Sequence, residues 1–106
     1  MYLVITKHTR PSVDVEFYTF KQSTRIQPEV KEYFLATYIF SGKVVHNAWK
    51  QSEDGLSTTS QAFWLSKADY ESFLNDPIIL SDYIPGRDAY CDEFGLTREL
   101  ISEEEI

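Results

Sequence analysis

The chain has 106 residues and a formal net charge of -7, because 17 Asp and Glu residues outnumber 10 Lys and Arg residues. This length allows a single domain core, and a composition of 42% hydrophobic and 15% aromatic residues excludes a wholly disordered chain. No run approaches the roughly 18 consecutive apolar residues of a membrane helix, and residues 1–8 show no signal-peptide pattern. We therefore expect a folded, cytoplasmic protein with no membrane partner.

The charge is divided unevenly between the two halves of the chain. Residues 1–50 hold seven Lys or Arg against four Asp or Glu, a net charge of +3, whereas residues 51–106 hold three against thirteen, a net charge of -10. Because an acidic chain is repelled by phosphate backbones, the composition disfavours general nucleic-acid binding. The acidic half could instead attract a basic protein partner, or the basic half of another copy.

The first part of the chain predicts a strand, an arm and a helix. The β-branched and aromatic residues of 2–8 are typical of a strand that leaves a buried sheet. A turn at Pro11 follows, and alternating apolar and polar residues over 13–18 favour an extended arm or a short strand. Pro28 suits the first turn of a helix, whose apolar stripe ends at Gly42.

A hairpin and a second helix follow. An Asp-Gly turn between alternating residues predicts paired strands over 43–51 and 56–65. Ser66 stands three residues before Asp69, as an N-cap serine stands before an acid in a capping box. The helix that begins there should end before Pro77, because proline disfavours a helical residue in front of it.

The pattern beyond the second helix is looser. Residues 78–80 suit a short strand or the start of another helix, and residues 87–94 suit a helical turn that ends at Gly95. A last short helix and an acidic tail are expected over 98–106. The expected organisation is therefore one α+β domain over 1–97, followed by that C-terminal segment.

The order of predicted elements points to a fold. Strand, helix, strand, strand and helix form most of a ferredoxin-like βαββα(β) sandwich, an α+β fold with an antiparallel sheet and helices on one face. The fourth strand is the missing part. Residues 78–80 could supply it, or a neighbouring subunit could cover the open edge.

Residues 63–74 form a junction in which a Trp at a strand end is followed by a Ser N-cap and by two aromatic residues along a helix. This junction resembles that of the antibiotic-biosynthesis-monooxygenase-like dimeric α+β barrel group. The resemblance covers 43–77. It implies a ferredoxin-like protomer whose sheet packs against that of a second subunit to form a barrel with a cavity. In haem-degrading members a first-strand Asn, this Trp and a later His line the pocket. Only Trp64 matches here, which argues against haem degradation.

Candidate catalytic residues are few. His8 and His46 are the only histidines, and no metal-ligand spacing, glycine-rich nucleotide loop or GxSxG motif is present. We therefore expect neither a metal nor a cofactor. If the hairpin lines a cavity, His46 or Asn47 could supply the polar group beside Trp64. The alternative is that His46 is simply hydrogen-bonded at a strand edge. Cys91, the only cysteine, is expected to be a small packed residue.

The 16 aromatic residues are a large load for one small core, since each side chain buries roughly 150–250 Å². Some are therefore expected at an interface, where Tyr and Trp are common; the alternative is a core that holds them all. The interface candidates are Tyr2, Tyr18, Phe20, Tyr38 and Trp49.

Three functions fit these observations. The leading hypothesis is a small acidic binding or assembly protein that forms a homo-oligomer, a class that includes viral accessory proteins, and is not an enzyme. The alternative is a cofactor-independent monooxygenase-like enzyme with a pocket in the dimeric barrel. A third hypothesis is an acidic mimic of nucleic acid, which requires the acids from Asp76 onward to form one ridge.

Overall fold

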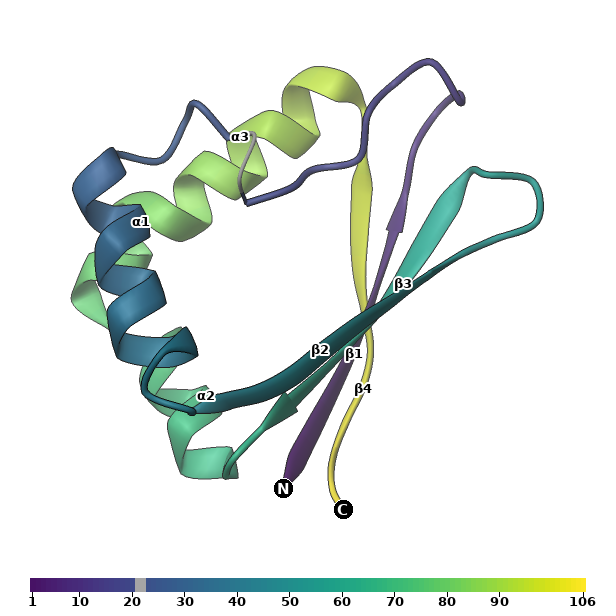
Figure 1. The fold of residues 1–106 in the computed structure, drawn as a ribbon. Coiled ribbons are helices and arrows are strands. Elements are labelled where there is room, and N and C mark those ends of the chain that lie inside the picture. Colours follow the sequence, from purple (N-terminus) through teal and green to yellow (C-terminus); the bar gives the residue numbers. More distant parts are fainter. Residues whose placement is uncertain (21–22) are drawn as a thin grey trace.

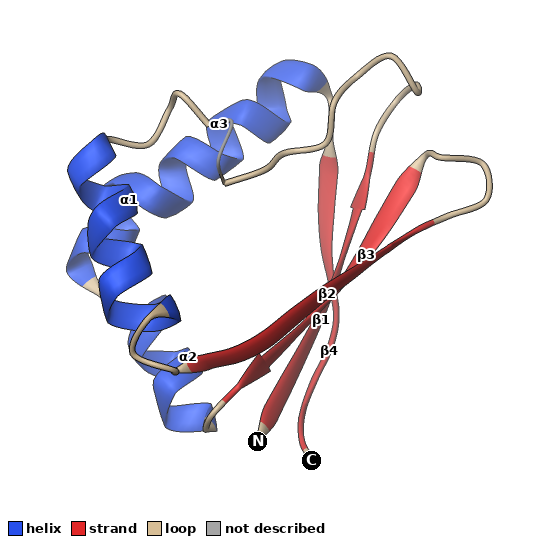
Figure 2. Cartoon of the chain, viewed as in Figure 1, coloured by secondary structure: helices blue, strands red, loops and turns tan. Residues whose placement is uncertain are grey.

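A computed structural model describes residues 1–20 and 23–106. Four antiparallel strands form a sheet in the order β2-β3-β1-β4, and the helices lie together on one side of it (Figure 1, Figure 2). The elements in chain order are β1 (Tyr2–Thr9), α1 (Pro28–Phe34), the π-helical turn η1 (Leu35–Ile39), β2 (Val44–Gln51), β3 (Ser57–Trp64), α2 (Lys67–Leu74), the π-helical turn η2 (Ile79–Tyr83), α3 (Ile84–Phe94) and β4 (Thr97–Glu105). This is the compact ferredoxin-like α+β fold expected from the sequence.

Local sequence signals are confirmed at several element boundaries. The hairpin joins β2 to β3 at the expected place, and Pro28 begins α1. The side chain of Ser66 accepts a hydrogen bond of 3.1 Å from the backbone N–H of Asp69 at the start of α2. Gly95 ends α3 with a φ of 71°, a left-handed conformation that glycine adopts without steric cost.

The fourth strand is not where the sequence suggested. Residues 78–80 are helical, because the Asp76 side chain accepts the backbone N–H of Ile78 at 2.9 Å and its carbonyl accepts that of Leu80 at 2.9 Å. Instead, β4 pairs with β1 along its whole length. The prediction of a short C-terminal helix over 98–106 is therefore wrong, because that segment forms β4 and completes the sheet.

The two ends of the described chain lie side by side (Figure 1), with the backbone N–H of Ile106 bonded to the carbonyl of Met1 at 2.9 Å. The segment 13–18 forms no strand; it follows the turn at Pro11 as a loop. The Arg10 side chain holds this loop by donating to the carbonyls of Val15 and Gly55 at 2.9 and 2.8 Å.

The core lies between the helices and the sheet face that carries alternate residues of β1. Tyr2, Val4 and Thr6 are buried on that face. The other core residues come mainly from the helices and the end of β3: Tyr38, Trp64, Tyr70, Phe73 and Ile79. Several of the aromatic side chains are thus buried in one cluster between the sheet and the helices.

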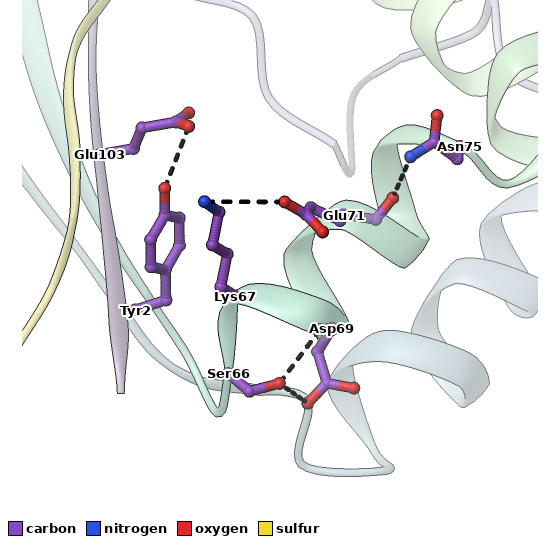
Figure 3. A network of polar contacts seen from close by, with 7 residues as sticks. All are labelled: Tyr2, Ser66, Lys67, Asp69, Glu71, Asn75 and Glu103. Carbon is purple, nitrogen blue, oxygen red and sulfur yellow. Dashed lines mark hydrogen bonds and ion pairs between the residues drawn. The ribbon is translucent and has the colours of Figure 1, made fainter.

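Polar contacts fix α2 at the end of β3 (Figure 3). The Ser66 hydroxyl lies 3.0 Å from an Asp69 carboxylate oxygen, completing the cap, while Lys67 and Glu71 form a 3.9 Å ion pair one turn apart. Nearby, the Tyr2 hydroxyl donates to Glu103 of β4 at 3.0 Å. The first two contacts therefore stabilise the start of α2, and the third joins the first strand to the last. Within the described chain, no helix combines the length and apolarity needed to cross a membrane.

Candidate functional site

A partly open cleft of about 230 Å³ lies between the helix-facing side of the sheet and the helices. Its walls are mostly aromatic and aliphatic, with polar groups at two places. The lining residues used below are Phe34, Asn47, Ser60, Trp64, Tyr70, Phe73, Tyr83, Arg87 and Arg98. Concave, mainly apolar cavities with a few polar groups are the usual form of a small-molecule site.

The aromatic wall is built by the junction between β3 and α2. Trp64 ends β3 and is only 5% exposed. Because Ser66 starts α2 directly afterwards, Tyr70 and Phe73, three residues apart, share the helix face that returns to the indole. Their ring centroids each lie 5.4 Å from that of Trp64. The motif that carried the family resemblance therefore places an indole in the cleft.

The opposite aromatic wall comes from α1 and η2. The rings of Phe34 and Tyr83 stack with centroids 4.8 Å apart. Behind them, Asp76 is buried and accepts hydrogen bonds from the hydroxyls of Tyr33 and Tyr38 at 2.5 and 2.7 Å. Burial alone would raise the pKa of Asp76, but the two hydroxyls lower it. This carboxylate is occupied in holding α1 and η1 to η2.

Two uncharged polar groups lie on the hairpin side of the cleft. Asn47 of β2 stands opposite Ala62 of β3 in the register, so it shares the helix-facing side with Trp64. The Ser60 hydroxyl donates to the Asn47 side-chain oxygen at 3.3 Å. The structure thus brings together Asn47 and Trp64, two of the three residues proposed from the sequence.

His46 is not in the cleft. It pairs with Phe63, the residue before Trp64, so it points to the other face of the sheet, where its ring lies 5.9 Å from that of Phe63. The expected constellation of His46 with Trp64 is therefore not formed within the chain. A bulge between Val44 and His46 shifts the register of β2, and that shift could not be read from the alternation of residues.

Two arginines that were not selected from the sequence also line the cleft. Arg87 comes from α3 and Arg98 from β4. Burial, followed by the charge of Arg87, lowers the pKa of Arg98, although part of its side chain is in solvent. The available signal was that these are two of only three basic residues in the acidic half. Their convergence depended on β4, which was predicted as a helix and tail.

His8 lies beside this pair. It stands opposite Arg98 in the register of β1 and β4, and its Nε2 atom is buried without a hydrogen-bond partner among the described residues. Burial lowers its pKa to about 4, and the charges of Arg98 and Arg87 act in the same direction. At neutral pH the His8 imidazole is therefore uncharged.

The aromatic residues proposed for an interface fall into three groups. Tyr2 and Tyr38 are core residues, only 5% and 2% exposed, so the protomer itself buries almost all of their surface. Tyr18 and Phe20 are half-buried against helices. The ring centroid of Tyr18 lies 5.6 Å from that of Tyr90 in α3, and that of Phe20 lies 5.2 Å from that of Phe34 in α1. Trp49, 69% exposed, alone of the five is available at the surface.

Other reactive groups do not form a site. Within residues 1–20 and 23–106, no three His, Cys, Asp or Glu side chains come together as metal ligands. Cys91 is buried, and burial raises the pKa of its thiol, which disfavours the thiolate that a nucleophile requires. The chemistry that the structure offers is therefore concentrated in the cleft.

Comparison with known proteins identifies the fold. No family model and no curated protein matches the chain. Among solved structures, a protein of Deinococcus radiodurans provisionally described as an antibiotic biosynthesis monooxygenase is 10% identical, with a TM-score of 0.56 over 100% of this chain and 92% of its own. SnoaB, a cofactor-independent oxygenase from Streptomyces nogalater, is 15% identical, with a TM-score of 0.55 over 99% and 91%. The chain thus shares the ferredoxin-like fold of antibiotic-biosynthesis-monooxygenase-like proteins.

Proposed function

We propose that this protein binds a small aromatic compound in the cleft between its sheet and helices. The observation that supports this most directly is the aromatic wall of Trp64, Tyr70 and Phe73, whose rings border an open volume. An apolar cavity of about 150 Å³ is enough for benzene, so about 230 Å³ suits a compound of one or two rings. Asn47 and Ser60 supply hydrogen-bonding groups to orient it.

Tryptophan fluorescence can test this binding, because the two tryptophans differ in position. In a Trp49→Phe variant the indole of Trp64 is the only one left, and it lines the cleft. Titration with naphthalene-2-carboxamide should quench that emission with saturation. The matched Trp64→Phe variant retains exposed Trp49 and should show no saturable quenching. Equal responses in the two variants would contradict binding in the cleft.

A second candidate is cofactor-independent oxygenation of the bound compound. The whole-chain fold likeness to SnoaB favours it, together with the joint presence of Asn47 and Trp64 in the cleft. In a balanced reaction a ring CH₂ becomes C=O, while O₂ supplies the carbonyl oxygen and one water, so the substrate provides all four electrons. The cleft would contribute by polarising the ring of the substrate and by excluding water from it.

Oxygen consumption measures this activity. With a panel of hydroxylated bicyclic compounds, turnover should require O₂ and fall at least tenfold in Asn47→Ala and Trp64→Phe. His46→Gln is the matched control, because His46 lies on the other face of the sheet, and its activity should stay unchanged. No oxygen uptake with any compound that binds would leave the protein as a binder and remove the enzyme hypothesis.

For assembly, we propose that the outer sheet face pairs two copies of the chain. The register places Leu3 beside Phe63, and Ile5 lies on the same face. All three are half-buried, although the helices that the structure describes lie on the other side of the sheet. Further along, the face carries Lys50 on β2 and Glu99 on β4, at opposite edges of the sheet. A two-fold axis parallel to the strands would place each Lys50 over the partner's Glu99, which supports a homodimer.

Analytical ultracentrifugation tests this assembly. We expect a dimer at tens of micromolar that becomes a monomer in Phe63→Asp. The matched control is Phe40→Asp, since Phe40 is 78% exposed beyond η1 on the helical side, and this variant should remain dimeric. A monomeric wild-type protein would contradict the proposal.

The third hypothesis from the sequence, an acidic mimic of nucleic acid, finds no support in the arrangement of the acids. Asp76 is buried, and Asp82 accepts the backbone N–H of Gln27 at 2.7 Å. On β4, Glu103 and Glu104 are consecutive residues and so point to opposite faces of the sheet. These acids do not form the single ridge that mimicry of phosphates requires.

A further inference from the structure

Both basic residues of the last quarter of the chain line one cleft. Arg87 reaches it from α3 and Arg98 from β4, from layers on either side of the opening. They come from a half of the chain that holds three basic residues against thirteen acids. Here the two guanidinium groups are close enough that each contributes to the electrostatic environment of His8.

Among the described residues, only Asp88 pairs with either arginine, and it contacts Arg87 alone. Arg87 donates from Nε to Asp88 at 3.2 Å, and no other described residue takes up its two terminal nitrogens. The side chain of Arg98 has no hydrogen bond or ion pair with any residue of 1–20 or 23–106. Two like charges in a partly desolvated cleft oppose each other, so the folded protein gains nothing from their proximity by itself.

His8 is a third unsatisfied group at the same place. Its Nε2 atom is buried without a hydrogen-bond partner in the part of the chain that the structure describes, and it lies across from Arg98 in the β1–β4 ladder. Buried polar atoms in native proteins are nearly always hydrogen-bonded, and an exception calls for an absent ion, water or ligand. The terminal nitrogens of Arg87, the whole guanidinium of Arg98 and the Nε2 atom of His8 thus have no hydrogen-bond partner among the described residues, and together they suit an anion.

The remainder of the cleft narrows the choice of anion. Its other walls are the rings of Trp64, Tyr70, Phe73 and Tyr83, which would leave most of a bare phosphate ion without partners. The planar arginine fork matches the two oxygens of a carboxylate. A flat ring between aromatic walls, with its carboxylate at the arginine end, satisfies both parts of the cleft.

We infer that the ligand is an aromatic carboxylate of one or two rings, held by its carboxylate group between Arg87 and Arg98 with His8 as an additional donor. This inference rests on the proposed binding of an aromatic compound in the cleft, and it adds the charge and orientation of that ligand. The aromatic part then lies toward Trp64.

The experiment compares two ligands of nearly equal shape. In the Trp49→Phe background, 2-naphthoate and its neutral isostere naphthalene-2-carboxamide are titrated at pH 7 while Trp64 emission is followed. Because hydrogen bonds to a charged group contribute about 1.5–3 kcal/mol, naphthoate should bind roughly tenfold to hundredfold more tightly. Arg98→Gln should reduce that preference to less than threefold, and Arg98→Lys should retain part of it.

Arg25→Gln is the matched control. Arg25 pairs with Glu93 outside the cleft, so its loss should leave the preference for naphthoate unchanged. Sodium phosphate added as a competitor identifies the source of the anion effect: it should displace naphthoate only at millimolar concentrations. Displacement at micromolar phosphate would overturn the carboxylate inference in favour of a phosphate site.

The other outcomes separate this inference from the proposed function. Equal binding of naphthoate and the carboxamide would overturn the carboxylate inference and leave the aromatic cleft standing. A preference that survives in Arg98→Gln with unchanged circular dichroism would also overturn it. No binding of either compound would refute the proposed function, and the inference with it.

Discussion

The half-buried histidine beside the arginine pair, His8, predicts a loss of stability in mild acid. Burial, Arg98 and Arg87 together lower the pKa of His8 from 6.5 to about 4 in the folded chain. Between these two values the unfolded chain binds more protons than the folded chain. Stability therefore rises with pH across this window, and it is lost as the pH falls from about 6.5 toward 4.

The magnitude follows from the difference between the two pKa values. One pKa unit corresponds to about 1.4 kcal/mol, which gives an upper limit of roughly 3 kcal/mol for the whole window. The His8 side chain is only partly buried, so solvent screening reduces this figure. We expect a loss of about 1–2 kcal/mol between pH 7 and pH 5.

Urea unfolding at pH 7 and pH 5 measures this loss. His8→Gln has no imidazole, so its free energy of unfolding should fall less than that of the wild type over the same interval, by about 1–2 kcal/mol. His46→Gln is the control for a histidine outside the cleft and should behave as the wild type does. Parallel losses in the wild type and His8→Gln would refute the reasoning.

Three substitutions test the packing that positions the cleft, each by urea unfolding at pH 7. Ser66→Ala removes the cap of α2 and should cost about 1 kcal/mol; a change near zero would show that Ser66 does not hold the helix start. Tyr38→Phe leaves buried Asp76 with one hydroxyl donor fewer and should cost about 1–3 kcal/mol, whereas a neutral result would mean that water replaces the hydroxyl. Gly86→Ala should cost about 1–3 kcal/mol, because a Cβ there would lie 2.6 Å from the Arg25 carbonyl oxygen; unchanged stability would mean that the backbone shifts freely.

The fold was predictable where the signals are local. The turn before β3, Pro28 at the start of α1 and the Ser66 cap each act within a few residues, so the printed sequence carries them. The strand at 97–105 was missed for the opposite reason. Its run of glutamates has low strand propensity, and it is a strand because β1 offers an unpaired edge 88 or more positions earlier in the chain.

The candidate site was predictable in part for the same reason. Trp64 belongs to a local strand-to-helix motif, and its place in the cleft follows from that junction. His46 was misplaced because a single bulge reverses which residues of β2 face the helices. Arg98 could not be selected at all while its segment was assigned to a helix and tail.

The sequence by itself determined the element types around local turns and caps, the uneven charge and the high aromatic content. Tertiary structure alone decided which residues share a face: it buried Tyr2 and Tyr38, turned His46 away from Trp64, and placed Arg87 and Arg98 in one cleft. The physical reason is that strand pairing depends on contacts between distant segments, where a one-residue change of register moves every side chain to the opposite face.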